Sequence, residues 1–340
     1  MGLFSSLFGR NKDESPSGPE GAAIQAAIEQ LVEDVDPRIR LIRGYRKKLR
    51  PGVEVALKQV SDIVARIPGP FALDTETWRT EPLVNAAFAR ADELPAVVSR
   101  SVEVEFFEQG AGKSSPECFA LFGMQREERR ILGKELIGEL IQSDVVQTTV
   151  SFTNHRLIAP ATTLDELRLA IERRAFHHLV EEAIHQVTRA LDRKKGLEEQ
   201  RALLRLKLKL MARQRQGLEG LVEAEPHVDQ KAEDLEKELA EVEARFRKLH
   251  IALTNLENYM PHLNKVLGHP EQYLSLREVS LRLNRMNILV TAPTKEPVQE
   301  LSLTEATLRD GRSFVLLLAK CSRDQLRPQW ALLDEAARLL

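Results

Sequence analysis

The sequence predicts an α+β protein that is mostly α-helical, with an antiparallel β-sheet body interrupted by a long antiparallel coiled-coil hairpin. Apolar residues recur at alternating spacings of three and four along residues 176–222 and again along 232–267, which is the heptad pattern of coiled-coil helices. Alternating apolar and polar residues, typical of strands, stand on both sides of this segment. The charged fraction of 29% with only 5% aromatic residues suits long solvated helices better than a large β-sandwich.

Residues 1–21 are predicted to form an amphipathic tip on a flexible linker. Four large apolar side chains of the tip fall on one side of a helical wheel, and residues 11–21 are polar with several prolines and glycines. Because a polar tether separates these side chains from any core, we expect the tip either to bind a membrane surface or a partner, or to pack on its own domain or stay disordered. The four side chains are Leu3, Phe4, Leu7 and Phe8.

Residues 22–160 are predicted to form a body that is helical at first and contains β-structure later. Asp36-Pro37 supplies an N-cap and a first-turn proline for a helix over residues 38–50. A further helix is predicted from Pro51 to the break at Pro68-Gly-Pro70.

The later part of this body is mixed. Residues 101–108 fit a strand and a helix equally well, and Ser115-Pro116-Glu117 predicts the start of a helix. From Arg129 to Pro160 the pattern predicts β-structure with a turn at Thr153-Asn154.

The predicted helix over 38–50, here called the basic segment, carries only positive charges. Such a helix is most often a solvated face over a core, but it could also contact an anionic membrane or a nucleic acid. The net charge of the chain is −2, so no global field favours nucleic acid. The basic side chains are Arg38, Arg40, Arg43, Arg46, Lys47, Lys48 and Arg50.

Residues 161–272 are predicted to form the coiled-coil hairpin, with its turn near residues 223–231. Folding the chain near residue 227 brings the apolar heptad positions of the two arms, here called the seam, opposite each other. The predicted seam pairs include Leu208 with Phe246, Leu204 with Leu249, and Leu197 with Leu256.

Charges support the same fold. The first arm is basic near the turn and the second is acidic, so an antiparallel fold brings opposite charges together. Three seam positions of the first arm, Lys194, Arg201 and Arg215, are themselves basic. Their aliphatic stems can lie along the seam while their charges lean out to water. In this fold Arg201 faces Leu253.

Residues 273–340 are predicted to return to the body as strands followed by a helix. An antiparallel hairpin brings its two ends back to one place, so strands before and after it can join one sheet. The predicted elements are strands over 275–290, 300–308 and 313–321, a turn at Asp310-Gly311, and a helix over 330–340.

The densest group of metal-capable side chains is His178, Glu182 and His185, which share one face of a predicted helix. Zinc would need a further ligand and supporting contacts from elsewhere in the chain. On a charged helix these residues most simply form a solvated face, so we expect no bound metal and no cofactor.

Motifs of catalysis are incomplete. Gly110-Ala-Gly-Lys113-Ser114 resembles the end of a phosphate-binding loop, but Phe107 stands where that loop needs glycine. Cys118 and Cys321 form no CxxC motif and are expected to be buried, reduced thiols. No apolar run approaches the length of a membrane span.

The sequence therefore predicts a non-enzymatic coiled-coil interaction or scaffold protein, located in the cytoplasm or at the periphery of a membrane. Its expected partner is a protein that binds the hairpin, and an anionic membrane surface is a second candidate. Two alternatives stay open: an enzyme whose site is built from scattered residues around His178, Glu182 and His185, or a nucleic-acid-associated protein that uses the basic segment. Nucleic acid is the less expected partner, since few aromatic residues are available for base stacking.

Overall fold

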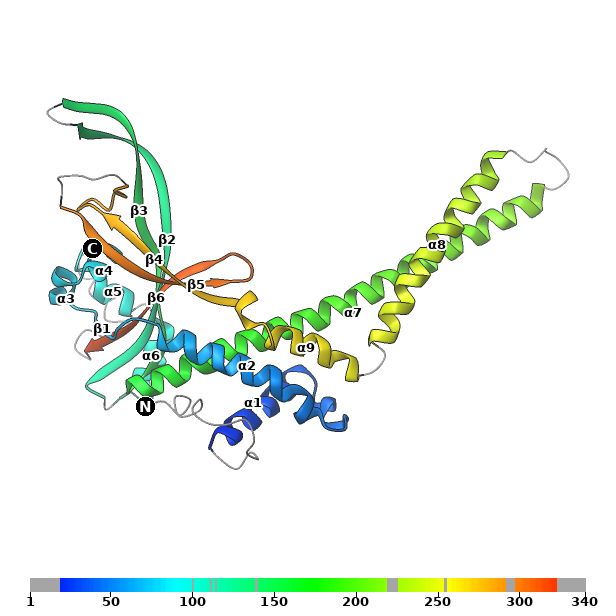
Figure 1. The fold of residues 1–340 in the computed structure, drawn as a ribbon, viewed down its shortest axis with the longest axis horizontal. Helices are drawn as coiled ribbons and strands as arrows, with labels where there is room; N and C mark the ends of the chain where they lie inside the picture. Colours follow the sequence, from blue (N-terminus) through cyan, green and yellow to red (C-terminus); the bar gives the residue numbers. More distant parts are fainter. Residues whose placement is uncertain are drawn as a thin grey trace, which may run out of the picture. The chain divides into compact units, whose positions relative to one another are not determined.

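A computed structural model describes residues 19–99, 101–110, 112–113, 115–137, 140–218, 226–253, 256–291 and 297–322 (Figure 1). Its fold is α+β with 57% helix, so the predicted class is confirmed. The chain divides into two compact units. The sheet unit consists of Leu57–His177 and the described residues from Pro270 onward, and the helical unit consists of the described part of Ser17–Ala56 together with His178–His269.

The sheet unit is built on one antiparallel sheet with the strand order β3-β2-β6-β5-β4. Two of its strands precede the long helices in the sequence and three follow them, and β2 pairs directly with β6. Strands from both sides of the helical insertion therefore share one sheet, as predicted. The strands are β2 (Glu117–Ile137), β3 (Leu140–Ala161), β4 (Leu274–Leu283), β5 (Gln299–Leu308) and β6 (Ser313–Ser322), and the short β1 (Phe71–Ala72) pairs with β6 in parallel.

A short segment after β4 bridges the two outer strands of this sheet. Ile288 pairs with Thr149 of β3, and Leu289 pairs with Leu283 of β4. The predicted strand over 275–290 therefore ends early, because the chain turns after Leu283. Asn287 takes a φ of +55° in this turn, a conformation that asparagine tolerates better than most residues.

The sheet is covered on both faces. Successive residues of β6 point to opposite faces of the sheet. Leu317 packs into a large core with the short helices α3, α4 and α5. Leu318 packs into a second core with the end of α2 and the start of α7. A central strand buried on both faces explains the nearly continuous apolar run of β6. The helices are α2 (Tyr45–Ala65), α3 (Thr75–Thr80), α4 (Pro82–Ala87), α5 (Glu93–Ser99), α6 (Val102–Gln109) and α7 (Leu164–Leu218).

Two local predictions for the sheet unit are wrong, and one ambiguous segment is resolved. Glu117 begins strand β2 rather than a helix, and the ambiguous residues 101–108 form α6, which is capped by Ser101. The predicted turn at Thr153-Asn154 is wrong, because both residues lie within β3. Asn154 has a φ of +53° at a register shift between β2 and β3, so its left-handed backbone makes a bulge instead of a turn.

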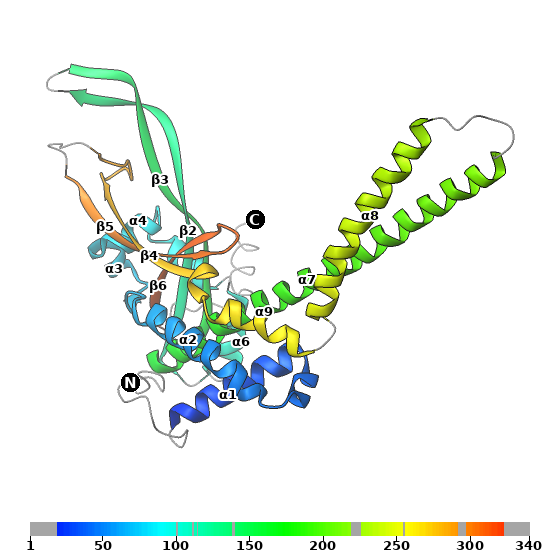
Figure 2. The same ribbon diagram turned by 45° about the vertical axis from the view of Figure 1, so that its right-hand side comes forward.

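Strands β2 and β3 continue well past the rest of the sheet. Pairing of β2 with β6 stops at Met124, and from there to Ile137 the described pairs of β2 are with β3 alone. Figure 2 shows this two-stranded ribbon extending beyond β4, β5 and β6.

The helical unit begins with α1 (Pro19–Val35), in agreement with the prediction that the body from residue 22 is helical at first. The other elements that belong wholly to it are the 3-10 helix η1 (Pro37–Leu41), α8 (Pro226–Leu253), the 3-10 helix η2 (Leu256–Tyr259) and α9 (Met260–Leu267), and parts of α2 and α7 complete it.

The basic segment is not one helix, and this prediction is wrong. Asp36 caps η1 by accepting from the backbone N–H of Arg38 at 2.9 Å, but η1 ends at Leu41. Gly44 then takes a φ of +71°, which separates η1 from α2. Helix α2 continues through Pro51, because the buried residues before and after this proline hold one face of the helix against the core.

Helices α7 and α8 run in opposite directions and cross each other (Figure 1), with Arg201 of α7 in contact with Phe246 of α8. From Leu191 to Met211 the shielded positions of α7 are predicted seam positions, and on α8 the seam residues Val242 and Phe246 are buried. Helix α7 packs against α8 and α9, and this burial agrees with the predicted seam, although Leu179 of α7 is buried outside it. Buried seam residues of α7 are Phe176, Val180, Ala183, Val187, Ala190 and Leu204.

Candidate protein-binding site

The two arms meet one heptad away from the predicted register. The guanidinium of Arg201 lies 4.3 Å from the centre of the Phe246 ring, a position predicted for Leu208. Leu197 lines a groove with Leu249 rather than facing Leu256. The predicted register is therefore wrong by seven residues on one arm. Because the seam pattern repeats every seven residues, seam positions still face seam positions after this shift.

The position of the turn explains this shift. The prediction folded the chain near residue 227, but α8 already begins at Pro226 and α7 ends at Leu218. Proline at the first position of a helix needs no N–H partner, so Pro226 starts α8 rather than interrupting it. The fold point lies several residues earlier, and the opposite seam positions move with it.

Opposite charges of the two arms do meet. Arg205 of α7 forms an ion pair with Glu243 of α8. This pair agrees with the predicted attraction between the basic and acidic arms, and the side-chain amide of Gln200 adds a hydrogen bond to Glu238 at 3.4 Å.

Three leucines of α7 lie outside the seam and stay half exposed. Leu203, Leu206 and Leu210 are exposed by 52%, 54% and 51%, respectively. Their spacings of three and four residues place them on one side of the helix, and this row is here called the leucine stripe. The heptad pattern did not predict the stripe, because it selects the seam positions Leu204 and Leu208 and leaves the neighbouring leucines unassigned.

A groove lies between α7 and α8, and its lining residues on α7 directly precede the leucine stripe in the sequence. Leu197 and Leu249 supply its apolar surface, and Gly196 has no heavy atom within 4 Å of where a Cβ would stand. None of its lining residues is acidic. The lining residues are Arg193, Gly196, Leu197 and Gln200 of α7, and Arg245, Lys248 and Leu249 of α8.

The candidate metal residues His178, Glu182 and His185 gain no further ligand nearby. Across the described ranges, no group of three histidine, cysteine, aspartate or glutamate side chains is placed to hold a metal ion. The Nδ1 atom of His178 lies 4.0 Å from Glu181 on the same helix, and His185 is exposed.

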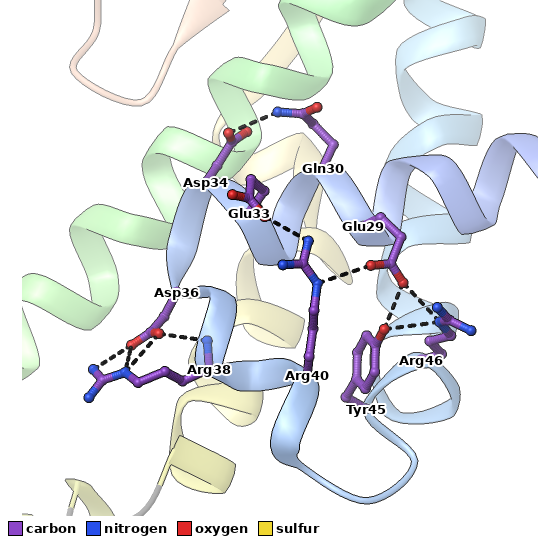
Figure 3. A network of polar contacts seen from close by, with 9 residues as sticks. All are labelled: Glu29, Gln30, Glu33, Asp34, Asp36, Arg38, Arg40, Tyr45 and Arg46. Atoms are coloured by element: carbon purple, nitrogen blue, oxygen red, sulfur yellow. Dashed lines mark hydrogen bonds and ion pairs between the residues drawn. The ribbon is translucent and has the colours of Figure 1, made fainter.

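The basic segment is largely neutralised by carboxylates, several of them on α1 (Figure 3). Arg40 pairs with Glu33 at 2.6 Å and with Glu29 at 3.3 Å. Glu29 also accepts from the hydroxyl of Tyr45 at 2.7 Å and from Arg46 at 2.8 Å. These hydrogen bonds, that from Tyr45 first, hold the pKa of Glu29 below its usual value.

The remaining basic residues divide into paired and exposed ones. Arg38 pairs with Asp36 at 2.7 Å, Lys48 with Glu257 at 2.8 Å, and Arg50 with Glu54 at 2.6 Å. For Arg43 and Lys47, which are exposed, no ion pair is found with any residue whose placement is described. In the sequence, the signal for this neutralisation is the group of acidic residues that precedes the basic segment, namely Glu29, Glu33 and Asp36.

The amphipathic tip with Leu3, Phe4, Leu7 and Phe8 lies outside the described residues, as does the helix predicted over 330–340. Arg215, the third basic seam position, belongs to α7, but its side chain is also outside the description.

Comparison with protein-family models, curated proteins and solved structures found no match for this chain. Among the helices described, none has a stretch both long and apolar enough to cross a bilayer.

Proposed function

We propose that this protein is a non-enzymatic interaction protein in which α7 and α8 form an antiparallel coiled coil that binds a helical segment of a protein partner. The observation that carries the proposal is the leucine stripe, Leu203, Leu206 and Leu210, which stays half exposed outside the seam. Anchors at spacings of three and four residues are the recognition pattern of one helix lying along another.

Covering the leucine stripe lowers the free energy, but burial of these three side chains alone does not give a stable complex. Full burial of a leucine contributes about 1.5–3 kcal/mol, so covering the exposed half of each would contribute roughly 1 kcal/mol. Three such contributions do not exceed the cost of association, which is at least about 4 kcal/mol. A stable complex therefore needs further contacts, and the neighbouring groove offers them.

Charge around the groove indicates the chemistry of the partner. Arg193, Arg245 and Lys248 line it, and Lys207 lies within the span of the leucine stripe. Arg245 lies 3.5 Å from Glu241, and both side chains are largely exposed. A partner helix with apolar anchors flanked by aspartate and glutamate would complement this surface, and its charges would speed association.

The alternatives have weaker support. For a membrane or a nucleic acid, the basic segment would have to give up the ion pairs that occupy five of its seven side chains. For a metal enzyme around His178, Glu182 and His185, which the structure does not group as a metal site, further ligands would have to come from outside the described residues.

Site-directed crosslinking in the native cell tests the proposal. A photoreactive side chain at position 206 should crosslink to an acidic helical segment of another protein, and Leu206→Asp should abolish capture of that protein. The matched control is Leu191→Asp, which changes another exposed leucine of α7 about 20 Å away along the helix. Capture that survives Leu206→Asp, or is lost equally with Leu191→Asp, would overturn the proposal.

A further inference from the structure

The two cysteines, more than 200 residues apart in the sequence, lie opposite each other in the sheet. Cys118 of β2 and Cys321 of β6 are direct partners in the antiparallel register. Both thiols are reduced, and both side chains are 1% exposed. The next pair, Glu117 with Ser322, is the last pair of the β2–β6 ladder among the described residues.

Direct opposition in the ladder meets the requirement that a disulfide places on the separation of the Cα atoms. Directly opposed residues of antiparallel strands have Cα atoms about 4.5 or 5.5 Å apart, depending on the hydrogen-bonding pattern. A disulfide spans Cα separations of about 4.4–6.8 Å. Opposed side chains also point to the same face of the sheet, so the two sulfur atoms share one side of β2 and β6.

The environment of the pair sets the conditions for its reaction. Burial raises the pKa of Cys321 to about 12, and the neighbouring Cys118 contributes to this rise. Since the thiolate is the reactive form, a closed pair reacts slowly with oxidants. The last rung of a strand ladder opens more readily than its centre, and such opening would give a small oxidant access to the second rung.

We propose that Cys118 and Cys321 form a cross-strand disulfide when the protein meets a low-molecular-weight disulfide such as oxidised glutathione. One cysteine thiolate attacks glutathione disulfide, the S–S bond breaks, and one glutathione leaves as a thiol. The second cysteine then attacks the protein sulfur of the mixed disulfide and releases the second glutathione. Two electrons pass from the cysteines to glutathione disulfide, and the two thiol protons end on the two released thiols.

The bond would fasten the end of β6 to the start of β2. Cys321 follows directly on the residues of β6 that β1 covers, because Ala319 and Lys320 pair with β1 and Cys321 does not. Oxidation would therefore extend the fixed part of β6 towards its last residue. The opening of this end of the β2–β6 ladder would then depend on the redox state of the surroundings.

Thiol counting on the folded full-length chain tests the inference. Incubation with oxidised glutathione should reduce the thiol content from two per chain to none, and dithiothreitol should restore both. Peptide mass mapping without reduction should show one link within the chain, between the peptides that contain Cys118 and Cys321. Amide hydrogen exchange at residues 117–119 and 320–322 should slow on oxidation.

Single variants provide the control. Cys118→Ser and Cys321→Ser should each show no intrachain link, and Cys118→Ala and Cys321→Ala serve where serine prevents folding. The inference is wrong if both thiols persist in the folded chain but react at once in denaturant. Mixed disulfides or links between chains as the sole products would also overturn it.

Discussion

Glu305→Gln should destabilise the sheet unit strongly, although it removes only a charge. The Glu305 side chain on β5 is 1% exposed and binds two arginines from two other strands of the sheet. Arg126 donates to it from β2 at 2.5 Å, and Arg277 donates from β4 at 2.7 Å. Burial alone would raise the pKa of Glu305, but the hydrogen bonds from the two arginines outweigh burial and lower it.

The expected loss follows from the exposure of the arginines. Removing one partner of a fully buried ion pair costs about 3–5 kcal/mol, because the other charge is left without compensation. Arg277 is 60% exposed and can turn towards water, and Arg126 retains Glu128. We therefore expect the lower end, about 3 kcal/mol, which lowers Tm by roughly 6–12 °C for a unit of this size.

Urea denaturation of the wild type and two variants measures this difference. The matched control is Glu128→Gln, which removes the exposed partner of the same Arg126 and should cost less than about 1 kcal/mol. A double replacement, Arg126→Met with Glu305→Leu, should recover much of the loss, since it leaves no buried charge. Equal unfolding midpoints for Glu305→Gln and Glu128→Gln would refute the reasoning.

Two further predictions concern the seam and a buried histidine. Leu204→Asp should reduce helicity and lower the free energy of unfolding by several kcal/mol, because Leu204 is 3% exposed. Circular dichroism in urea measures both quantities. The control is Leu203→Asp at a half-exposed position, which should leave both unchanged. His155 stacks on Phe88 and Phe122, and burial lowers its pKa, so the folded chain takes up a proton less readily than the unfolded chain. Stability from neutral His155 should be complete above about pH 6.5 and decline below it, and His155→Phe should flatten this decline in urea midpoints measured from pH 7.5 to 5.

The strands after the helices were predictable because their signals are local. Leucines alternate with polar residues at the start of β5, β6 is a nearly continuous apolar run, and the two strands are joined by a turn in which Gly311 has a φ of +85°, as the predicted Asp310-Gly311 turn requires. β2 and β3 were harder, because the charged residues 126–130 interrupt the apolar pattern where β2 pairs only with β3. Asn154 then resembled a turn, since a bulge and a turn use the same left-handed backbone.

Contacts between distant side chains were not predictable in this way. The basic segment read as a charged surface because no residue within it is acidic, yet Glu29 and Glu33 approach it from the preceding helix. The opposition of Cys118 and Cys321 depends on the register between β2 and β6. Register is set by the packing of a whole sheet face and leaves no mark at two isolated positions.

The hairpin shows why a periodic signal identifies a seam but not its partner. Moving one arm by seven residues again brings seam positions against seam positions, so apolar pattern alone does not choose between registers. Loop length decides, and here α8 starts at Pro226. The register that results also accounts for a basic seam residue: Arg201 was expected to lean out to water beside Leu253, but its guanidinium lies over the Phe246 ring at 4.3 Å. A cation over an aromatic face gains electrostatic attraction that a leucine does not offer, so this register makes an arginine in the seam favourable where the predicted one only tolerated it.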